Sequence, residues 1–247
     1  MQAMIHVKNL VKRFGSILAV DNIAFEVNKG EVLGFLGPNG AGKSTTMKMI
    51  TCYLRPDSGT ATIGGYDILK NSVDVRRIIG YVPENVPAYE EMTVYSFLKF
   101  VCDARDIKGA DATKAIKRVI EQCSITNVVH QIIATLSKGY KRRVGLAQAL
   151  IHDPEILILD EPTDGLDPNQ KHDVRQMIKV MGKNKCIIIS THILEEVEAV
   201  CSRAIIIAKG RVLADGTPAE LAAKGDGKLD KYFREITTSK KTQEVAK

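Results

Sequence analysis

The sequence contains no apolar run that approaches the roughly 18 residues needed for a membrane-spanning helix. Its N-terminus also lacks the short basic region and apolar block that mark a signal peptide. These absences predict a chain that stays in the cytoplasm. The five cysteines are scattered without metal or redox spacing, so we expect reduced and mostly buried thiols.

Internal repeats are also missing, which predicts one structural unit rather than two. The 247 residues, of which 45% are hydrophobic, suffice to bury a substantial core. A net charge of +6 raises nucleic acid or an acidic membrane surface as a partner. However, no aromatic residues interleave the densest basic cluster, so phosphate-side or solvent-facing charge is favoured over a nucleic-acid patch. This cluster is Lys138, Lys141, Arg142 and Arg143.

The most informative motif is a glycine-rich stretch between an apolar run at 32–36 and a helical segment at 46–50. Glycines let backbone N–H groups turn toward a phosphate chain, and a helix N-terminus adds partial positive charge. Lys43 supplies a charge for the outer phosphates, and the Ser44 hydroxyl can hold Mg²⁺. An ordinary glycine turn explains neither side chain. The pattern predicts a nucleoside triphosphate site made of Gly37, Pro38, Asn39, Gly40, Ala41, Gly42, Lys43, Ser44 and Thr45.

A second apolar run at 155–159 ends in two carboxylates, Asp160 and Glu161. In open parallel sheets, ligands bind at the carboxyl ends of the strands. Asp160 can therefore reach the Mg²⁺ shell, while Glu161 can orient and deprotonate an attacking water. The alternative is that both carboxylates cap the turn at Pro162.

A third stretch, Leu136-Ser137-Lys138-Gly139-Tyr140, resembles the signature loop of ABC ATPases. With Phe14, the phosphate loop, Gly165-Leu166-Asp167 and His192, the resemblance runs in the family's order from about residue 4 to residue 220. It implies a P-loop α/β cassette that hydrolyses ATP with Mg²⁺. It also implies that two cassettes sandwich two ATP molecules head to tail. Ser137 and Gly139 would then contact the outer phosphate held by the opposite subunit.

Three further positions carry over by the resemblance. Phe14 stands where the family stacks a ring on adenine, although core packing is an alternative for a lone Phe. Asp167 resembles the acidic residue that crosses the dimer interface, and it also has the pattern of a helix N-cap before Pro168. Both roles can hold together. His192 follows a strand at the position where the family reaches the outer phosphate.

The chain departs from the common family pattern at four positions. Lys138 replaces a glycine and Tyr140 a glutamine in the signature loop, and Asp164 takes a place often filled by a small residue. Glu84 stands where most relatives have a metal-binding glutamine, so we expect it to bind metal and to couple the site to a partner. A solvated turn residue after Pro83 is the alternative. Acidic versions of this loop resemble a subset of single-cassette bacterial exporters.

The spacing of apolar residues changes along the chain and divides it into segments. Residues 1 to about 30 alternate as in an antiparallel strand pair, and about 88–152 shows helical spacing without strands. Apolar strands return at 155–160, 186–190 and 204–208, which predicts a parallel α/β sheet. We expect one ABC ATPase domain at 1–225, with a helical subdomain at about 88–152. A C-terminal helix and a mobile tail would follow at 226–247.

We therefore expect an ATP-hydrolysing subunit that works as a homodimer or with a paired cassette. By the resemblance, it powers a separate integral membrane permease from the inner face of the membrane, with export favoured over import. The permease would dock on the helical subdomain near residues 84–91. The alternative is a soluble ABC ATPase acting on ribosomes or nucleic acid, but the paired cassettes or coiled-coil insertion usual there are not visible. A regulatory module with little turnover is disfavoured by Glu161 and His192.

Overall fold

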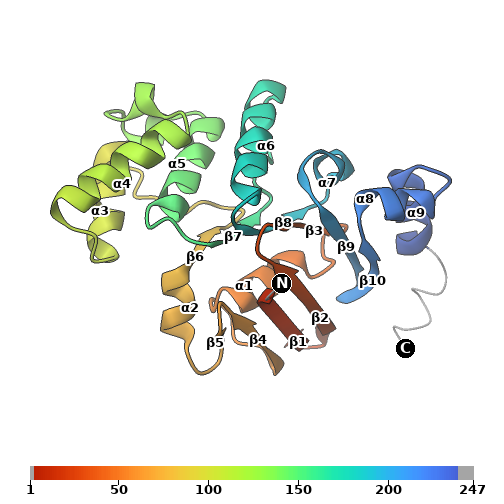
Figure 1. Ribbon diagram of the computed structural model, residues 1–247. Coiled ribbons are helices and arrows are strands. Elements are labelled where there is room, and N and C mark those ends of the chain that lie inside the picture. Colours follow the sequence, from red (N-terminus) through yellow and green to blue (C-terminus); the bar gives the residue numbers. More distant parts are fainter. Residues whose placement is uncertain (1–2, 239–247) are drawn as a thin grey trace.

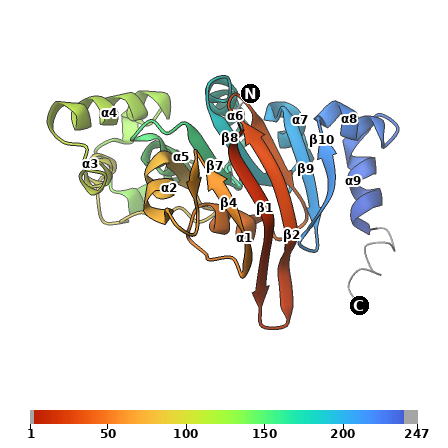
Figure 2. The ribbon, with the colours of Figure 1, turned by 60° about the horizontal axis from the view of Figure 1, so that its bottom comes forward.

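The computed structural model describes residues 3–238. Two strands at the N-terminus, β1 (Ala3–Phe14) and β2 (Ile17–Asn28), pair antiparallel, as their alternation of apolar and polar residues predicts. Two shorter strands, β4 (Ser58–Ile63) and β5 (Tyr66–Asp67), complete a four-stranded sheet in the order β2-β1-β4-β5. The long β1 and β2 strands extend past the rest of the core (Figure 2). The N-terminal antiparallel subdomain is therefore confirmed.

The central sheet has six strands in the order β10-β9-β3-β8-β7-β6. Its strands are β3 (Val32–Leu36), β6 (Ile79–Val82), β7 (Ile156–Asp160), β8 (Cys186–Thr191), β9 (Arg203–Ala208) and β10 (Arg211–Gly216). Five are parallel, as expected, while the additional strand β10 pairs antiparallel with β9. The two residues between β9 and β10 leave no length for the crossover that parallel strands need.

Apolar residues cover both faces of the central sheet. On β7, Leu157 and Leu159 belong to a core shared with helices α5 (Lys138–Leu150) and α6 (Pro168–Gly182). Ile156 and Ile158 belong to a second core shared with helix α1 (Lys43–Ile50) and the antiparallel sheet. All residues of β3, β7 and β8 are buried. Burial on both sides explains why these strands are continuous apolar runs rather than alternating ones.

The helices lie around this sheet (Figure 1). Helices α3–α5 form the helical subdomain at one end of the molecule, and α8 and α9 lie at the other. Thr217 and Glu220 make the expected capping box at the start of α8. The helices are α1 (Lys43–Ile50), α2 (Ser72–Ile78), α3 (Val94–Ala104), α4 (Gly109–Gln122), α5 (Lys138–Leu150), α6 (Pro168–Gly182), α7 (Leu194–Val200), α8 (Pro218–Ala223) and α9 (Leu229–Thr238).

The C-terminal segment contains the expected helix, because α9 begins at Leu229 and packs with α8 against β9. The tail expected after it, residues 239–247, lies outside the described residues. The division of the chain at residue 225 stays a prediction.

Strand register decides which loops meet. Asp160 of β7 pairs with Ser190 of β8, and Leu36 of β3 pairs with Thr191 of β8. The segments that follow β3, β7 and β8 therefore leave the sheet side by side at its carboxyl edge. The segment after β6 leaves at the same edge, because β6 runs parallel to β7. This edge holds the chemistry predicted from the sequence.

His152, just after α5, makes the stability of the fold depend on pH. Its Nε2 donates to the carbonyl of Ile79 on β6 at 3.0 Å, and burial lowers its pKa to about 4. As pH falls from about 6.5 to about 4, the unfolded chain takes up a proton here before the folded one does, so the free energy of unfolding falls.

The substitution His152→Gln removes this proton uptake. Between about pH 7.5 and about pH 5, the free energy of unfolding should therefore fall by about 1–2 kcal/mol less in His152→Gln than in the wild type. Urea unfolding at both pH values measures this. An identical loss in both proteins would contradict it, and His172→Gln, on the exposed side of α6, is the control.

Candidate functional site

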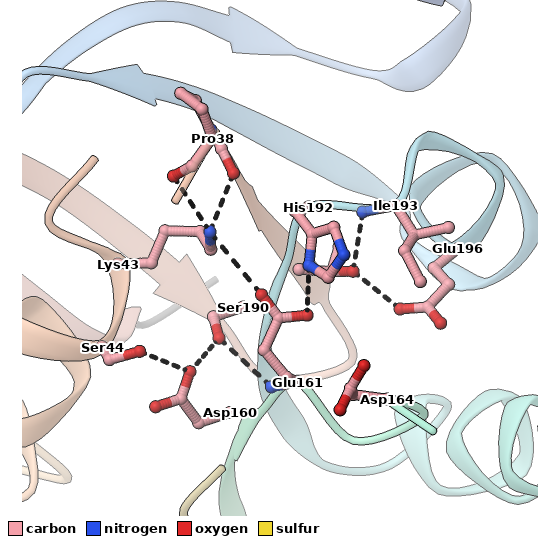
Figure 3. A network of polar contacts seen from close by, with 12 residues as sticks. Pro38, Lys43, Ser44, Asp160, Glu161, Asp164, Ser190, His192, Ile193 and Glu196 are labelled. Atoms are coloured by element: carbon pink, nitrogen blue, oxygen red, sulfur yellow. Dashed lines mark hydrogen bonds and ion pairs between the residues drawn. The ribbon is translucent and has the colours of Figure 1, made fainter. Parts of the chain in front are cut away.

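The glycine-rich loop makes a tight turn between β3 and α1. Gly42 caps α1 with φ of +100°, and a Cβ there would lie 2.4 Å from the carbonyl oxygen of Ala19, so only glycine fits. Lys43 follows with a side chain that is only 6% exposed. Its Nζ donates to the carbonyl oxygens of Gly37 at 2.8 Å and Pro38 at 3.2 Å (Figure 3). The loop thus holds a buried positive charge beside its own backbone.

Glu161 points at this lysine from the end of β7. Its Oε1 lies 3.6 Å from Lys43 Nζ, and its Oε2 accepts a hydrogen bond from His192 Nδ1 at 3.0 Å (Figure 3). The backbone of Glu161 has φ of +49°, a left-handed conformation that is unfavourable for a residue with a Cβ. Its N–H donates to the Ser190 carbonyl at 3.0 Å. A strained residue held in place by its neighbours is typical of a functional site.

Asp160 is 1% exposed and accepts a hydrogen bond at Oδ1 from Ser44 Oγ at 3.1 Å. Ser190 Oγ bonds the same carboxylate oxygen. A hydroxyl and a carboxylate in contact are oxygen donors of the kind that Mg²⁺ prefers, so these residues fit the metal expected there. The two carboxylates after β7 thus face the phosphate loop and His192, not the turn at Pro162, and the turn-capping alternative fails.

A cavity of about 660 Å³ opens beside these residues. It is lined by Phe14, Ile17, Leu18, Ala19, Asn39, Gly40, Ala41, Gly42, Lys43, Ser44, Thr45, Glu84, Glu161, Asp164 and His192. Phe14 is 48% exposed, so its ring is not core packing, and Lys12 Nζ lies over the ring at 5.8 Å from its centroid. Glu84 reaches the same cavity from the segment after β6. One hollow therefore brings together most of the residues predicted from the sequence.

Ser137, Gly139 and Asp167 do not line this cavity. Ser137 caps α5, where its Oγ accepts from the N–H of Tyr140 at 3.4 Å. Asp167 caps α6, as its sequence pattern predicts, by accepting from the N–H of Gln170 at 2.9 Å. The side-chain amide of Gln170 lies directly against Gly139. The signature loop is thus outside the nucleotide cavity of its own chain.

Two of the departures from the family pattern contact each other. Lys138 Nζ donates to Asp164 Oδ2 at 2.9 Å, and this hydrogen bond lowers the pKa of the Asp164 carboxyl. Asp164 also lines the cavity. The two unusual residues therefore compensate each other's charge at its rim.

Within the basic cluster, Arg142 is not solvent-facing but lies buried behind the residues of the cavity. The residue as a whole is only 4% exposed. Nη1 donates to the carbonyl oxygens of Pro83 at 3.0 Å and Glu84 at 2.8 Å, and Nη2 donates to that of Glu161 at 2.9 Å. The spacing contained a signal, because Arg142 falls on the same helical face as the apolar Leu146 and the small Gly139.

A second buried group supports the segment that carries His192. Glu196 on α7 is 2% exposed, and burial raises the pKa of its carboxyl. Its Oε2 accepts from Thr191 Oγ1 at 2.8 Å, and Thr191 Oγ1 in turn accepts from the N–H of Ile193 at 3.1 Å (Figure 3). Sequence reasoning missed Glu196 and Ser190. Their only local signal is a polar residue at the end of an apolar strand or on an apolar helix face.

Comparison with known proteins identifies the family. The ABC transporter family model matches residues 20–164, more than half of the chain. The chain belongs to the ABC transporter family. It is 38% identical over 225 residues to the linearmycin resistance ATP-binding protein LnrL of Bacillus subtilis, covering 91% of this chain and 72% of that protein.

Two other similarities agree with this assignment. The Nod factor export ATP-binding protein I of Burkholderia lata is 37% identical over 220 residues, which cover 89% of this chain and 72% of that protein. A solved structure of an ATP-binding subunit of an ABC transporter superposes with a TM-score of 0.86 at 30% identity, covering 95% of this chain and all of that one.

The ABC cassette is thus an ATPase subunit that powers transport through a membrane partner. These similarities do not favour the ribosomal alternative. Within residues 3–238, every helix is too short or too polar to cross a membrane.

Lys43→Ala should abolish tight ATP binding, because no other side chain at the loop replaces the charge that Lys43 offers to the phosphates. Lys48→Ala is the matched control, since Lys48 lies on the exposed side of the same helix. Filter binding with labelled ATP measures both variants. Wild-type affinity in Lys43→Ala would remove the assignment.

Proposed function

We propose that this ABC cassette closes with a second cassette around two MgATP molecules and hydrolyses them to drive export through a separate integral membrane permease. The observation that carries the proposal is the Glu161 carboxylate, which lies between Lys43 and His192 at the mouth of the cavity. A base next to two phosphate-seeking groups is what hydrolysis of a bound triphosphate requires.

The nucleotide would lie along the cavity. Phe14 stacks on adenine, and the residues from Gly37 to Thr45 surround the phosphates, with the amides of the loop and the N-terminus of α1 donating to them. Lys43 must then leave the carbonyls of its own loop and turn toward the outer phosphates. Its contact with Glu161 is weak enough at 3.6 Å to exchange for a phosphate oxygen.

Ser44 and Asp160 would hold Mg²⁺, and Glu84 would complete its ligands from the segment after β6. When bound, Mg²⁺ neutralises phosphate charge and orients the outer phosphate. Glu161 accepts the proton of the attacking water. His192, held by its hydrogen bond to Glu161, contacts the outer phosphate.

The site is incomplete in one chain, which supports a dimer. Ser137 and Gly139 lie at the N-terminus of α5, where backbone N–H groups favour an anion, yet they are outside the cavity of their own chain. In a head-to-tail dimer they would contact the outer phosphate of the other chain, with Asp167 bridging the interface. The second cassette is another copy of this chain or a paired relative.

The permease would dock on the helical subdomain near residues 84–91. Tyr89 and Phe100 are exposed there with ring centroids 5.1 Å apart, the kind of aromatic pair that anchors an interface. A second cavity, of about 470 Å³, lies between this subdomain and the core beside Tyr53, Arg76 and Arg105. Docking there places the cassette on the cytoplasmic face of the membrane. The relative named for Nod factor export supports export as the direction of transport.

Glu161→Gln should retain ATP binding but reduce hydrolysis to a small residual rate, because the amide cannot accept the proton while the other contacts persist. The ATP-bound dimer should then accumulate. Size-exclusion chromatography with ATP and Mg²⁺ detects it, and Glu195→Gln, an exposed acid on α7, is the control. A variant that stays monomeric at high protein concentration would count against the head-to-tail dimer.

Glu84→Gln should reduce ATP hydrolysis only mildly, whereas Glu84→Ala should reduce it severely. Glutamine keeps one oxygen ligand for Mg²⁺, and alanine keeps none. We expect the Gln variant to hold kcat within about tenfold, a barrier change of roughly 1.4 kcal/mol. The Ala variant should need more Mg²⁺ and should respond less to the permease. Titrating the ATPase rate against Mg²⁺ separates the roles: superimposable curves for wild type and Glu84→Ala would leave Glu84 as a solvated turn residue.

A further inference from the structure

Arg142 connects two loops that carry different parts of the proposed chemistry. One guanidinium donates to Pro83 and Glu84, which follow β6, and to Glu161, which follows β7. Arg142 itself belongs to α5, so a helix of the helical subdomain holds both loops of the core sheet.

Because Arg142 is buried, its guanidinium needs hydrogen-bond acceptors from the protein in place of water. The guanidinium of a residue that is only 4% exposed has lost most of its water and must be compensated by acceptors. The three carbonyl oxygens at 2.8–3.0 Å provide that compensation, and hydrogen bonds from a charged donor are stronger than those from a neutral one. The planar fork of Arg can reach several acceptors at once, which an ammonium cannot.

The backbone of Glu161 needs such support. Its left-handed φ of +49° persists only if neighbours hold both sides of the residue. On one side, the Glu161 N–H donates to the Ser190 carbonyl, and on the other, the Glu161 carbonyl accepts from Arg142. This conformation directs the carboxylate toward Lys43 and His192.

The loop after β6 is also packed on α5. Val86 lies directly against Gly145, which is three residues along the helix from Arg142. A displacement of this loop would therefore move the carbonyls of Pro83 and Glu84 relative to Arg142. Since the same guanidinium holds Glu161, the displacement would reach the Glu161 backbone through a single side chain.

We propose that Arg142 is a positioning residue that keeps Glu161 in its working conformation and links it to the loop after β6. This proposal rests on the proposed function, in which Glu161 is the base. Movement of the helical subdomain would then set the rate of hydrolysis without changing the phosphate loop.

Arg142→Met tests the link, because it keeps the length of the side chain and removes every donor. We expect single-turnover ATP hydrolysis to fall by about tenfold or more, while the Kd for ATP changes less than about twofold. Arg142→Lys should recover only part of the rate. Arg143→Met is the matched control on the same helix, since Arg143 pairs with Asp173 on α6 and contacts neither loop.

The Glu161→Gln background separates positioning from general damage. If Arg142 acts through Glu161, Arg142→Met should slow hydrolysis in the wild type but not further in Glu161→Gln. An equal slowing in both backgrounds would overturn the proposal. Full activity of Glu161→Gln alone would instead overturn the base assignment.

Amide hydrogen exchange tests the link through Arg142 independently of activity. Arg142→Met should speed exchange in residues 83–91 and 161–166, and the phosphate loop at 37–45 should exchange as in the wild type. Arg143→Met should leave both loops protected. Unchanged exchange at both loops in Arg142→Met would overturn the proposal even if the rate fell. Accelerated exchange over the whole chain would also overturn it, because Arg142 would then be a general stability residue.

Discussion

The buried ammonium of Lys43 is the constraint on which the rest of the site depends. A cation that is 6% exposed must be compensated, and the compensation comes from two loop carbonyls and from Glu161. Glu161 can reach it only because β8 alone separates β3 from β7 in the sheet. The protein therefore supplies acceptors for Lys43 from the loop itself and from the end of β7.

The sheet and the helical subdomain contribute in different ways. Strands buried on both faces give the carboxyl edge a rigid geometry, because close-packed cores resist displacement on either side. The helical subdomain reaches that edge through α5, whose Arg142 crosses to both loops. The carboxyl edge of the sheet is thus rigid, and a separate subdomain contacts it. This arrangement allows changes at the site to be transmitted to the subdomain.

The Lys138–Asp164 pair shows how departures from a family pattern can be neutral for the fold. Both side chains are largely exposed, and pairs of this kind contribute about 0–1 kcal/mol to stability. Their effect is local, because a cation beside Ser137 and an anion in the cavity wall cancel each other. Substituting one partner alone would leave the other charge unbalanced at the rim.

The sequence by itself determined the glycine-rich loop, the two carboxylates at the end of β7, the helix caps at Asp167 and Thr217, and the alternation of strands and helices in the core. Each of these depends on residues within a few positions of one another, so local pattern is sufficient. Tertiary structure alone decided that Arg142 contacts the loops after β6 and β7, that Ser190 bonds Asp160, and that Lys138 meets Asp164 across 26 positions of sequence. Such contacts depend on how the strands are ordered and how α5 packs on the sheet. No local spacing specifies those arrangements, because they result from burying the apolar faces of all the elements together.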